Sequence, residues 1–280
     1  MTLFLVHGGR LLRVFAVLFF YLFFVFVFGL VGLLFNLHYG FFVGIALAII
    51  VLAIIFKYGE KFILLFAKAR YVSDDENLVN QVKNFCTHLD IDEIKVYWSN
   101  VYFNNVYFVN SFWGTPSIIV GKEVYKQLSK NELNSLIYAT ILRIKSQESK
   151  YRSSINLVTL CLFWWVFLIS NQFSKTQFKS ITNVFLYPAF YLKKIFYQRA
   201  DDTEYFDSKV FRHELLKRDY ISALFKVNKM VLPRPLSIGA FVLNGLSHTF
   251  NVSDDVLFYI LIQNETPIED RIKQLSGKLQ

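Results

Sequence analysis

A stretch of 43 residues, 14–56, contains no Asp, Glu, Lys or Arg, and no other feature constrains the fold of this chain as strongly. A membrane-spanning helix needs about 20 apolar residues, so this stretch is long enough for two. Its one polar, turn-prone interruption is Asn-Leu-His-Tyr-Gly at 36–40. The sequence therefore predicts a helical hairpin over 1–56, with spans at about 14–35 and 41–56. The stretch lacks the short apolar core and cleavage site of a signal peptide, so we expect it to remain in the mature protein.

Two further segments extend the membrane prediction. Residues 153–174 are uncharged and strongly apolar, which predicts a third span. Residues 180–197 contain Pro188 and reach Lys193 and Lys194 after only 13 uncharged positions, so this segment either crosses the membrane or lies in its interface. A composition of 54% hydrophobic residues with 31 Phe makes an ordinary soluble enzyme improbable.

The basic residues predict the orientation of these spans. Cytoplasmic flanks of membrane helices are enriched in Lys and Arg. With four spans, twelve basic residues fall on one side of the membrane: Arg10, Arg13, Lys57, Lys61, Lys68, Arg70, Lys145, Lys150, Arg152, Lys193, Lys194 and Arg199. We therefore expect an integral protein of the bacterial inner (plasma) membrane, with both termini and the polar segments 57–152 and 199–280 in the cytoplasm.

The net charge of +9 accumulates from these flanks. Segment 57–152 has 13 basic and 10 acidic residues, and segment 193–280 has 13 and 11, so neither has the concentrated basic face of a nucleic-acid-binding domain. We expect no nucleic-acid partner. The two cysteines, Cys86 and Cys161, fall in the cytoplasm and in a predicted span, so we expect no disulfide between them.

The cytoplasmic segments predict a small mixed α and β domain. Amphipathic spacing indicates a helix over 72–89 with Ser73 as a possible N-cap, and β-branched and aromatic runs indicate strands at 94–98, 106–109 and 117–120. Ser129 and Glu132 form a capping-box pattern that opens a helix over 130–148. Helices are also predicted at 199–228 and 267–279. The fold class is α+β, mainly helical, with three to four transmembrane helices and a small antiparallel or mixed sheet.

This order of elements resembles the HtpX-type membrane zinc metallopeptidases. Asn-Ser-Phe-Trp-Gly at 110–114 looks like the segment before that family's edge strand, and Ile-Ile-Val-Gly at 118–121 looks like the strand itself. Ser129, Glu132 and Leu133 look like the entry to its zinc helix. The most specific match is Thr-Pro-Ile-Glu-Asp-Arg-Ile at 266–272, which resembles the family's His-Pro-x-x-Glu-x-Arg-Ile.

The resemblance implies a zincin-like cytoplasmic domain, but the zinc-binding residues are missing. In the family, His-Glu-x-x-His places two metal ligands one helical turn apart and a general base between them. The register from Glu132 puts Ala139, Thr140 and Arg143 at these positions. Alanine has no donor atom, threonine cannot act as a carboxylate base, and a cationic arginine would repel the metal. We therefore expect no zinc and no other cofactor.

The region of the family's third ligand, a Glu, keeps only its acidic character, in Asp201, Asp202, Glu204 and Asp207. We predict that Arg143 forms an ion pair with Asp201, Asp202 or Glu204, which replaces the tie that zinc would provide. The resemblance also implies structural roles for the following residues: Arg143, Asp202, Pro267, Glu269 and Arg271.

These features favour a pseudopeptidase that binds or regulates other membrane proteins, or their unfolded segments, without cleavage. Extended segments would add to an edge strand through backbone hydrogen bonds, which need no metal. The residues predicted to contact them are Asn110, Phe112, Ser117, Ile118, Ile119 and Val120. The other predicted partner is the lipid bilayer, and the sequence does not indicate an oligomeric state.

Two alternatives stay open. The first is an active metallopeptidase with non-standard ligands, which would use His213, Glu214 and His248. The second is a membrane scaffold, such as an assembly or immunity factor. No phosphate-binding loop, Cys-x-x-Cys or Gly-x-Ser-x-Gly motif indicates another catalytic site.

Overall fold

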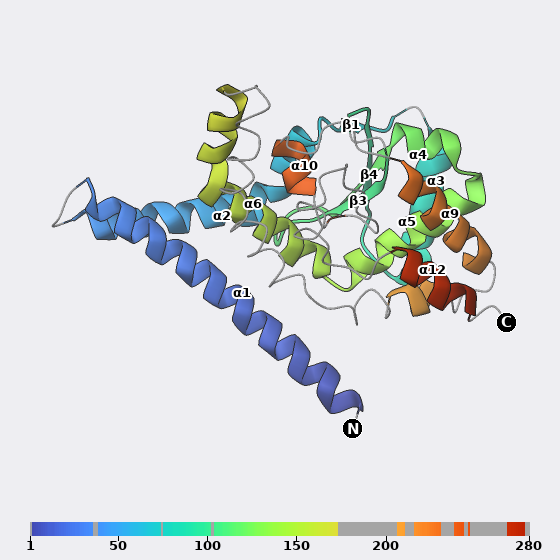
Figure 1. Cartoon of the computed structure of the whole chain (residues 1–280), viewed down its shortest axis with the longest axis horizontal. Coiled ribbons are helices and arrows are strands. Elements are labelled where there is room, and N and C mark those ends of the chain that lie inside the picture. Colours follow the sequence, from blue (N-terminus) through green and yellow to red (C-terminus); the bar gives the residue numbers. More distant parts are fainter. Residues whose placement is uncertain are drawn as a thin grey trace. The chain divides into compact units, whose positions relative to one another are not determined.

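A computed structural model of the 280-residue chain describes residues 2–35, 39–73, 75–101, 104–172, 206–210, 216–230, 238–243, 246 and 268–277. The chain divides into two compact units, Met1–Lys57 and Tyr58–Gln280. Its elements are mainly helices, and a small mixed sheet lies in the second unit (Figure 1).

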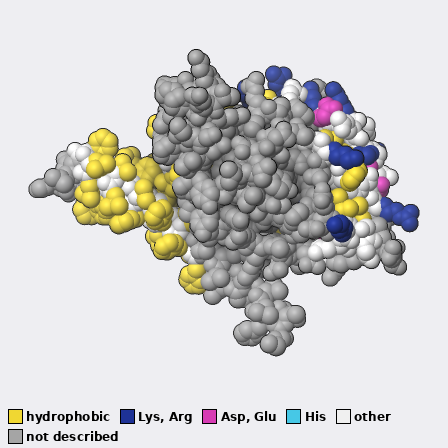
Figure 2. Space-filling model, viewed as in Figure 1, with side chains coloured by type: hydrophobic (Ala, Val, Ile, Leu, Met, Phe, Trp, Pro, Cys, Tyr) yellow, Lys and Arg dark blue, Asp and Glu magenta, His cyan; other side chains and the backbone are white. Residues whose placement is uncertain are grey.

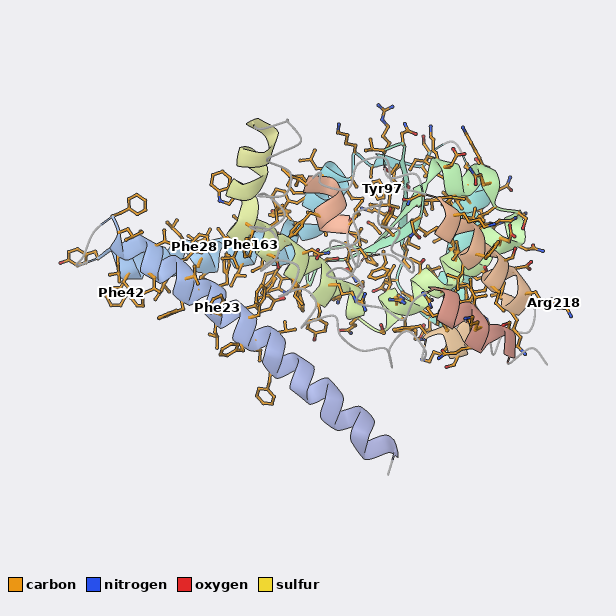
Figure 3. The ribbon with its side chains drawn as sticks, viewed as in Figure 1. Phe23, Phe28, Phe42, Tyr97, Phe163 and Arg218 are labelled. Atoms are coloured by element: carbon orange, nitrogen blue, oxygen red, sulfur yellow. The ribbon has the colours of Figure 1, made fainter. Side chains whose placement is uncertain are left out.

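The first unit is the predicted hairpin, made by α1 (Thr2–Leu33) and the first part of α2 (Gly40–Phe66). Large apolar side chains face outward from both helices, as Phe23 and Phe42 do in Figure 3, and the visible side chains of the hairpin are almost all hydrophobic (Figure 2). Among the described residues, α2 alone is long and apolar enough to cross a membrane, and Val17–Leu33 of α1 is a shorter apolar helix. A single membrane helix is thus supported, while three to four spans stay a prediction.

Four glycines let the two hairpin helices touch at the backbone. A methyl group on Gly32 would lie 2.0 Å from the carbonyl oxygen of Gly40, and one on Gly44 would lie 2.2 Å from that of Phe28. A methyl group on Gly29 would lie 2.8 Å from the ring of Phe41. Close contact through small residues is how helices associate in lipid, where the hydrophobic effect does not drive them together.

We predict that Gly32→Leu separates α1 from α2, because a leucine side chain cannot occupy the space of the Gly40 carbonyl group. The distance between spin labels at Leu18 and Ile54, both exposed, should increase by about 2 Å or more and broaden. The matched control is Ala46→Leu, at an exposed position of α2. An unchanged distance in Gly32→Leu, in a background without native cysteines, would contradict the packing.

The second unit is built on a four-stranded sheet in the order β1-β2-β4-β3. The strands are β1 (Arg70–Tyr71), β2 (Lys95–Ser99), β3 (Val106–Val109) and β4 (Ser117–Gly121). β2 and β4 are parallel, whereas the two outer pairs are antiparallel. The three predicted strands and a mixed sheet are confirmed. β1 was not predicted, because two residues are too short a run to show alternation.

Three helices of the same unit are α3 (Glu76–Leu89), α4 (Lys122–Gln127) and α5 (Lys130–Lys145). Helix α3 lies between β1 and β2 in the sequence, and α4 and α5 follow β4. The predicted amphipathic helix at 72–89 is confirmed as α3, but Ser73 is not its cap: the Asp75 side chain accepts a hydrogen bond from the Leu78 amide at 3.0 Å. The predicted capping box of α5 is present in full. α5 ends three residues earlier than expected, and Gln147 in the turn that follows has a left-handed φ of 61°.

Helix α6 (Glu148–Gln172) corresponds to the predicted third span. Its first half is enclosed by protein, because polar side chains there are buried and the Asn156 amide donates to the Val242 carbonyl oxygen at 2.7 Å. Crossing of a membrane by α6 therefore stays a prediction, and segment 180–197 lies outside the described residues. The remaining helices are α9 (Lys217–Lys229), α10 (Ile238–Leu243) and α12 (Ile268–Gly277), of which α12 confirms the predicted C-terminal helix.

Candidate functional site

Helix α5, which the resemblance aligns with a zinc-binding helix, lies largely inside the second unit. It packs against α3, α9 and strand β3. Every residue from Glu132 to Ile144 except Asn134 is buried. The chain therefore uses residues 132–144 of this helix as core on nearly all sides.

The three positions of the missing motif are filled with packed side chains. Ala139 and Thr140 are fully buried, and the Thr140 hydroxyl donates to the carbonyl oxygen of Leu136 at 2.7 Å, one turn back in the same helix. Ala139 has no donor atom, and the hydroxyl of Thr140 is bonded within its own helix. With a cationic Arg143 as the third member, this set does not fit a zinc ion.

Arg143 and Arg271 are the two largest fully buried side chains among the described residues. The guanidinium carbon of Arg143 lies 5.8 Å from the ring centroid of Phe108 on β3 and 5.3 Å from that of Phe206, which is close enough for cation–π attraction to both rings. Phe206 directly follows the acidic segment 201–205. The predicted ion pair of Arg143 with Asp201, Asp202 or Glu204 lies outside the described residues, and so does Asp202 as a structural residue.

A buried ion pair joins the segment 206–210 to the C-terminal helix. Arg271 of α12 donates to Asp207 from Nε to Oδ2 at 2.9 Å and from Nη2 to Oδ1 at 2.8 Å. The Tyr220 hydroxyl of α9 donates to Asp207 Oδ1 at 2.8 Å and accepts from Arg271 Nη2 at 3.2 Å. Burial, and then the negative charge of Asp207, raise the pKa of Tyr220, so its hydroxyl keeps its proton. The network holds α9, α12 and the 206–210 segment together.

Of the residues with predicted structural roles near the C-terminus, the structure describes the side chain of Arg271 alone. Pro267 and the side chain of Glu269 lie outside the described residues. Arg271 is 2% exposed, which suits an internal tie between elements. Its partner is Asp207, which the sequence identified as acidic but did not distinguish from its neighbours.

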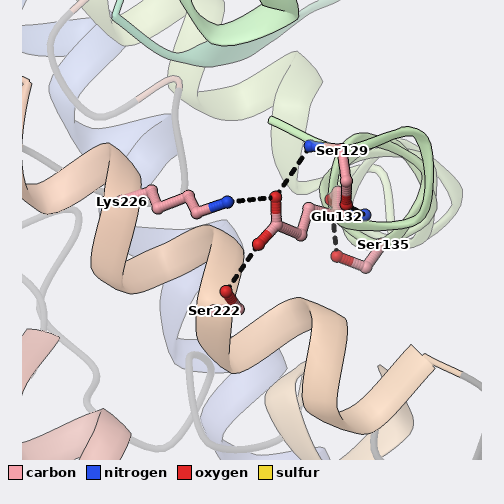
Figure 4. A network of polar contacts seen from close by, with 5 residues as sticks. All are labelled: Ser129, Glu132, Ser135, Ser222 and Lys226. Atoms are coloured by element: carbon pink, nitrogen blue, oxygen red, sulfur yellow. Dashed lines mark hydrogen bonds and ion pairs between the residues drawn. The ribbon is translucent and has the colours of Figure 1, made fainter. Parts of the chain in front are cut away.

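A second polar network joins the start of α5 to α9 (Figure 4). The Glu132 carboxylate accepts hydrogen bonds from the Ser129 amide at 2.7 Å, from Lys226 Nζ at 2.8 Å and from the Ser222 hydroxyl. Desolvation by burial acts to raise the pKa of Glu132, but the bonds from Lys226, Ser222 and Ser129 outweigh it and lower that pKa to about 2. The capping role of Glu132 was predictable from the sequence, whereas its tie to α9 was not.

This lowered pKa predicts a loss of stability in acid. Folding favours ionised Glu132, so its contribution is complete above the ordinary pKa of 4.5 and disappears as the pH falls from there to about 2. We expect this carboxylate to account for about 2 kcal/mol of unfolding free energy at pH 6, and Glu132→Gln to remove that part of the pH dependence. Denaturant unfolding at pH 6 and pH 3 measures both effects. The matched control is Asp92→Asn, which removes an exposed carboxylate elsewhere.

The predicted peptide-binding strand is not at the edge of the sheet. β4 lies between β2 and β3 and pairs with both, and all five of its residues are buried. The prediction of an edge strand at 117–120 is therefore wrong: Ser117, Ile118, Ile119 and Val120 belong to a strand that is paired on both sides. An extended segment cannot add to it without displacing a strand.

The edge of β3 and the other predicted peptide-contacting residues also have partners within the chain. At the end strand β3, the Phe108 amide donates to the carbonyl oxygen of Leu246 at 2.8 Å, so the chain itself uses this point of the outer edge. The Asn110 amide group donates to the Ser149 hydroxyl at 3.4 Å, and the ring of Phe112 lies 5.4 Å from that of Tyr151 in an edge-to-face contact. Asn110 and Phe112 thus contact α6.

A buried carboxylate that the sequence analysis did not single out attaches the end of α2 to the sheet. Glu60 is 7% exposed and accepts a hydrogen bond from the Ser117 hydroxyl at 2.8 Å. A methyl group on Gly114 would lie 2.0 Å from Ser111 Oγ and 2.9 Å from Glu60 Oε2, so this glycine makes room for both side chains. One signal was available: Glu60 is the first acidic residue in the chain and comes shortly after the long uncharged stretch.

No group of three or more His, Cys, Asp and Glu residues that could hold a metal ion occurs in the part of the chain that the structure describes. His213, Glu214 and His248, the alternative ligand set, lie outside that part. In comparisons with known proteins, no family model matches the chain. No curated protein sequence matches it significantly either. The resemblance to HtpX-type peptidases therefore stays a prediction from the motifs.

Proposed function

We propose that this chain is a membrane pseudopeptidase, with the architecture of an HtpX-type metallopeptidase and no zinc chemistry. One observation carries the proposal: the positions that correspond to His-Glu-x-x-His are buried core, and Arg143 lies there within cation–π range of two aromatic rings. A metallopeptidase needs an open metal position that substrate and water can reach. A buried cation at this place is incompatible with one.

The membrane part of the proposal is a hairpin followed by one or two further spans, in a bacterial inner membrane with both termini in the cytoplasm. It is supported by the exposed apolar side chains of α1 and α2, by their glycine contact and by the one-sided distribution of basic residues. In a bilayer these exposed side chains would face lipid or the helices of another membrane protein.

The position of β4 changes how partners are expected to bind. Because β4 is paired on both sides, we propose that other membrane proteins are bound through side-chain surfaces rather than by strand addition. The same observation favours the scaffold alternative, in which the chain holds a folded partner instead of an unfolded segment. Recovery of a folded partner with no bound extended segment would support the scaffold.

Metal analysis and a peptidase assay on the detergent-purified full-length protein test the proposal. We expect below about 0.1 zinc ion per chain and no cleavage of unfolded casein, with an active zinc peptidase in the same detergent as the positive control. Arg143→Ala and His213→Ala should leave both results unchanged. Stoichiometric zinc that His213→Ala removes, together with chelator-sensitive cleavage, would establish the active metallopeptidase instead.

A further inference from the structure

We propose that the C-terminal turns of α2 and the residues directly after them bind anionic phospholipid headgroups. The inference rests on the membrane location in the proposed function and adds the lipid class and the residues. The surface consists of exposed aromatic, leucine and basic side chains, which we call the lipid face: Tyr58, Lys61, Phe62, Leu65, Lys68, Arg70 and Tyr71.

The helical part of this surface is a single stripe. At 100° per residue, Tyr58, Lys61, Phe62 and Leu65 fall within an arc of about 100°. All four are exposed, and Leu65 is 69% exposed, more than Tyr58 or Phe62. On the opposite side of the same turns Ile63 is fully buried, and Glu60 accepts a hydrogen bond from the Ser117 hydroxyl of β4. The stripe is therefore the outward face of these turns.

The charge of the lipid face has one sign. Glu60 is the one acidic residue between 58 and 71, and its carboxylate points to the other side of the helix, where it accepts from Ser117. Lys61 lies beside the stripe's aromatic residues, with its Nζ 5.3 Å from the ring centroid of Tyr58. The exposed side thus combines aromatic rings and ammonium groups, and its acid is hidden.

The end of α2 adds further basic residues to this surface. The Ala69 amide donates to the Leu64 carbonyl oxygen at 2.9 Å, and Lys68 adopts a left-handed φ of 49°, a position that usually favours glycine. This turn leads directly into β1. Arg70 and Tyr71 of β1 are both exposed, and the ring of Tyr71 is supported by an edge-to-face contact with Tyr97 at 5.6 Å.

This combination fits the headgroup region of a bilayer. Aromatic residues and lysines are enriched where a membrane helix leaves the hydrocarbon core, and basic clusters there attract anionic lipids. α2 runs without a break from the uncharged segment into the lipid face, which brings these residues to the boundary if the uncharged segment crosses the membrane. A free phosphate would use the basic residues alone, whereas a lipid also uses Phe62 and Leu65, so we assign the surface to lipid.

Native mass spectrometry of the full-length protein in detergent, titrated with phosphatidylglycerol or phosphatidylcholine, tests this assignment. Each basic residue at an anionic lipid surface contributes about fivefold in affinity, so the wild type should prefer phosphatidylglycerol by about 100-fold. Lys61→Gln combined with Lys68→Gln should reduce this preference to about fivefold and leave phosphatidylcholine binding unchanged. The matched control combines Lys83→Gln with Lys122→Gln, which removes two exposed lysines elsewhere and should keep the full preference.

Three results would overturn the assignment: no preference in the wild type, an unchanged preference in the Lys61/Lys68 variant, or an equal loss in the control. Displacement of the lipid by millimolar glycerol phosphate would also overturn it, since it would identify a site for free phosphate. Resistance to carbonate extraction, measured on the membranes from which the protein is purified, tests the membrane location by itself. It therefore distinguishes a failure of the lipid assignment from a failure of the proposed function. A protein that resists extraction but shows no lipid preference contradicts the lipid assignment alone.

Discussion

Replacing Asp207 with alanine is expected to lower the unfolding free energy by about 3–5 kcal/mol, because Arg271 would remain buried without its counter-charge. The pair is 2% and 5% exposed at the side chains, so water cannot replace the carboxylate. Tyr220 would lose the acceptor of its hydroxyl proton at the same time. Denaturant unfolding of the detergent-purified protein near pH 7 measures the change.

A double-mutant cycle isolates the ion pair from the loss of packing. Asp207→Ala combined with Arg271→Ala should cost clearly less than the sum of the two single variants, because the double variant leaves no buried charge alone. Asp92→Ala, at an exposed site, serves as the control and should change the unfolding free energy by less than about 0.5 kcal/mol. A cost below about 1 kcal/mol for Asp207→Ala would show that the pair does not hold the elements together.

Arg143→Ala is expected to lower the unfolding free energy by a comparable amount, about 3–5 kcal/mol, for a different reason. The substitution empties a fully buried volume at the last turn of α5 and removes the cation that lies within cation–π range of Phe108 and Phe206. Arg143→Met keeps most of the stem volume and should be less destabilising than alanine. Arg143→Lys keeps the charge but loses the planar group that stacks on the rings, so we expect an intermediate cost.

The control for this series is Lys130→Ala, at an exposed position in the first turn of the same helix, with an expected change below about 0.5 kcal/mol. The triple variant Ala139→His, Thr140→Glu, Arg143→His introduces the His-Glu-x-x-His motif and tests whether these positions can bind zinc. Because these positions are packed core, we expect it to be destabilised and to bind no stoichiometric zinc. An Arg143→Ala protein as stable as the Lys130→Ala control would contradict a central role for this arginine.

Local sequence patterns predicted most helices and strands of the second unit. They could not predict how these elements are arranged relative to one another. The capping box at Ser129 and the β-branched runs at 106–109 and 117–120 are encoded within a few residues, and the structure confirms them. The order of strands is not encoded locally: β3 and β4 are both fully buried apolar runs, yet one lies at the end of the sheet and the other inside it. The burial of a strand's side chains therefore does not show whether the strand lies at the edge or in the interior of the sheet.

The same limit applies to the candidate site. The degenerate positions Ala139, Thr140 and Arg143 followed from motif register, and the structure shows that they are buried. The partner of Arg271 is 64 residues away in sequence, and several acids in one short segment were equally plausible. Which of them faces the arginine is decided by packing of α9 and α12, and sequence spacing does not specify that packing.

Glu132 contributes both to the start of one helix and to the packing of that helix against another. One carboxylate closes the first turn of α5 through the Ser129 amide and fixes α9 through Ser222 and Lys226. The first turn of α5 therefore cannot fray without releasing its neighbour, so the amides of both helices should exchange their hydrogens in one cooperative opening. A side chain that specifies where a helix begins also makes the folding of two distant segments a single event.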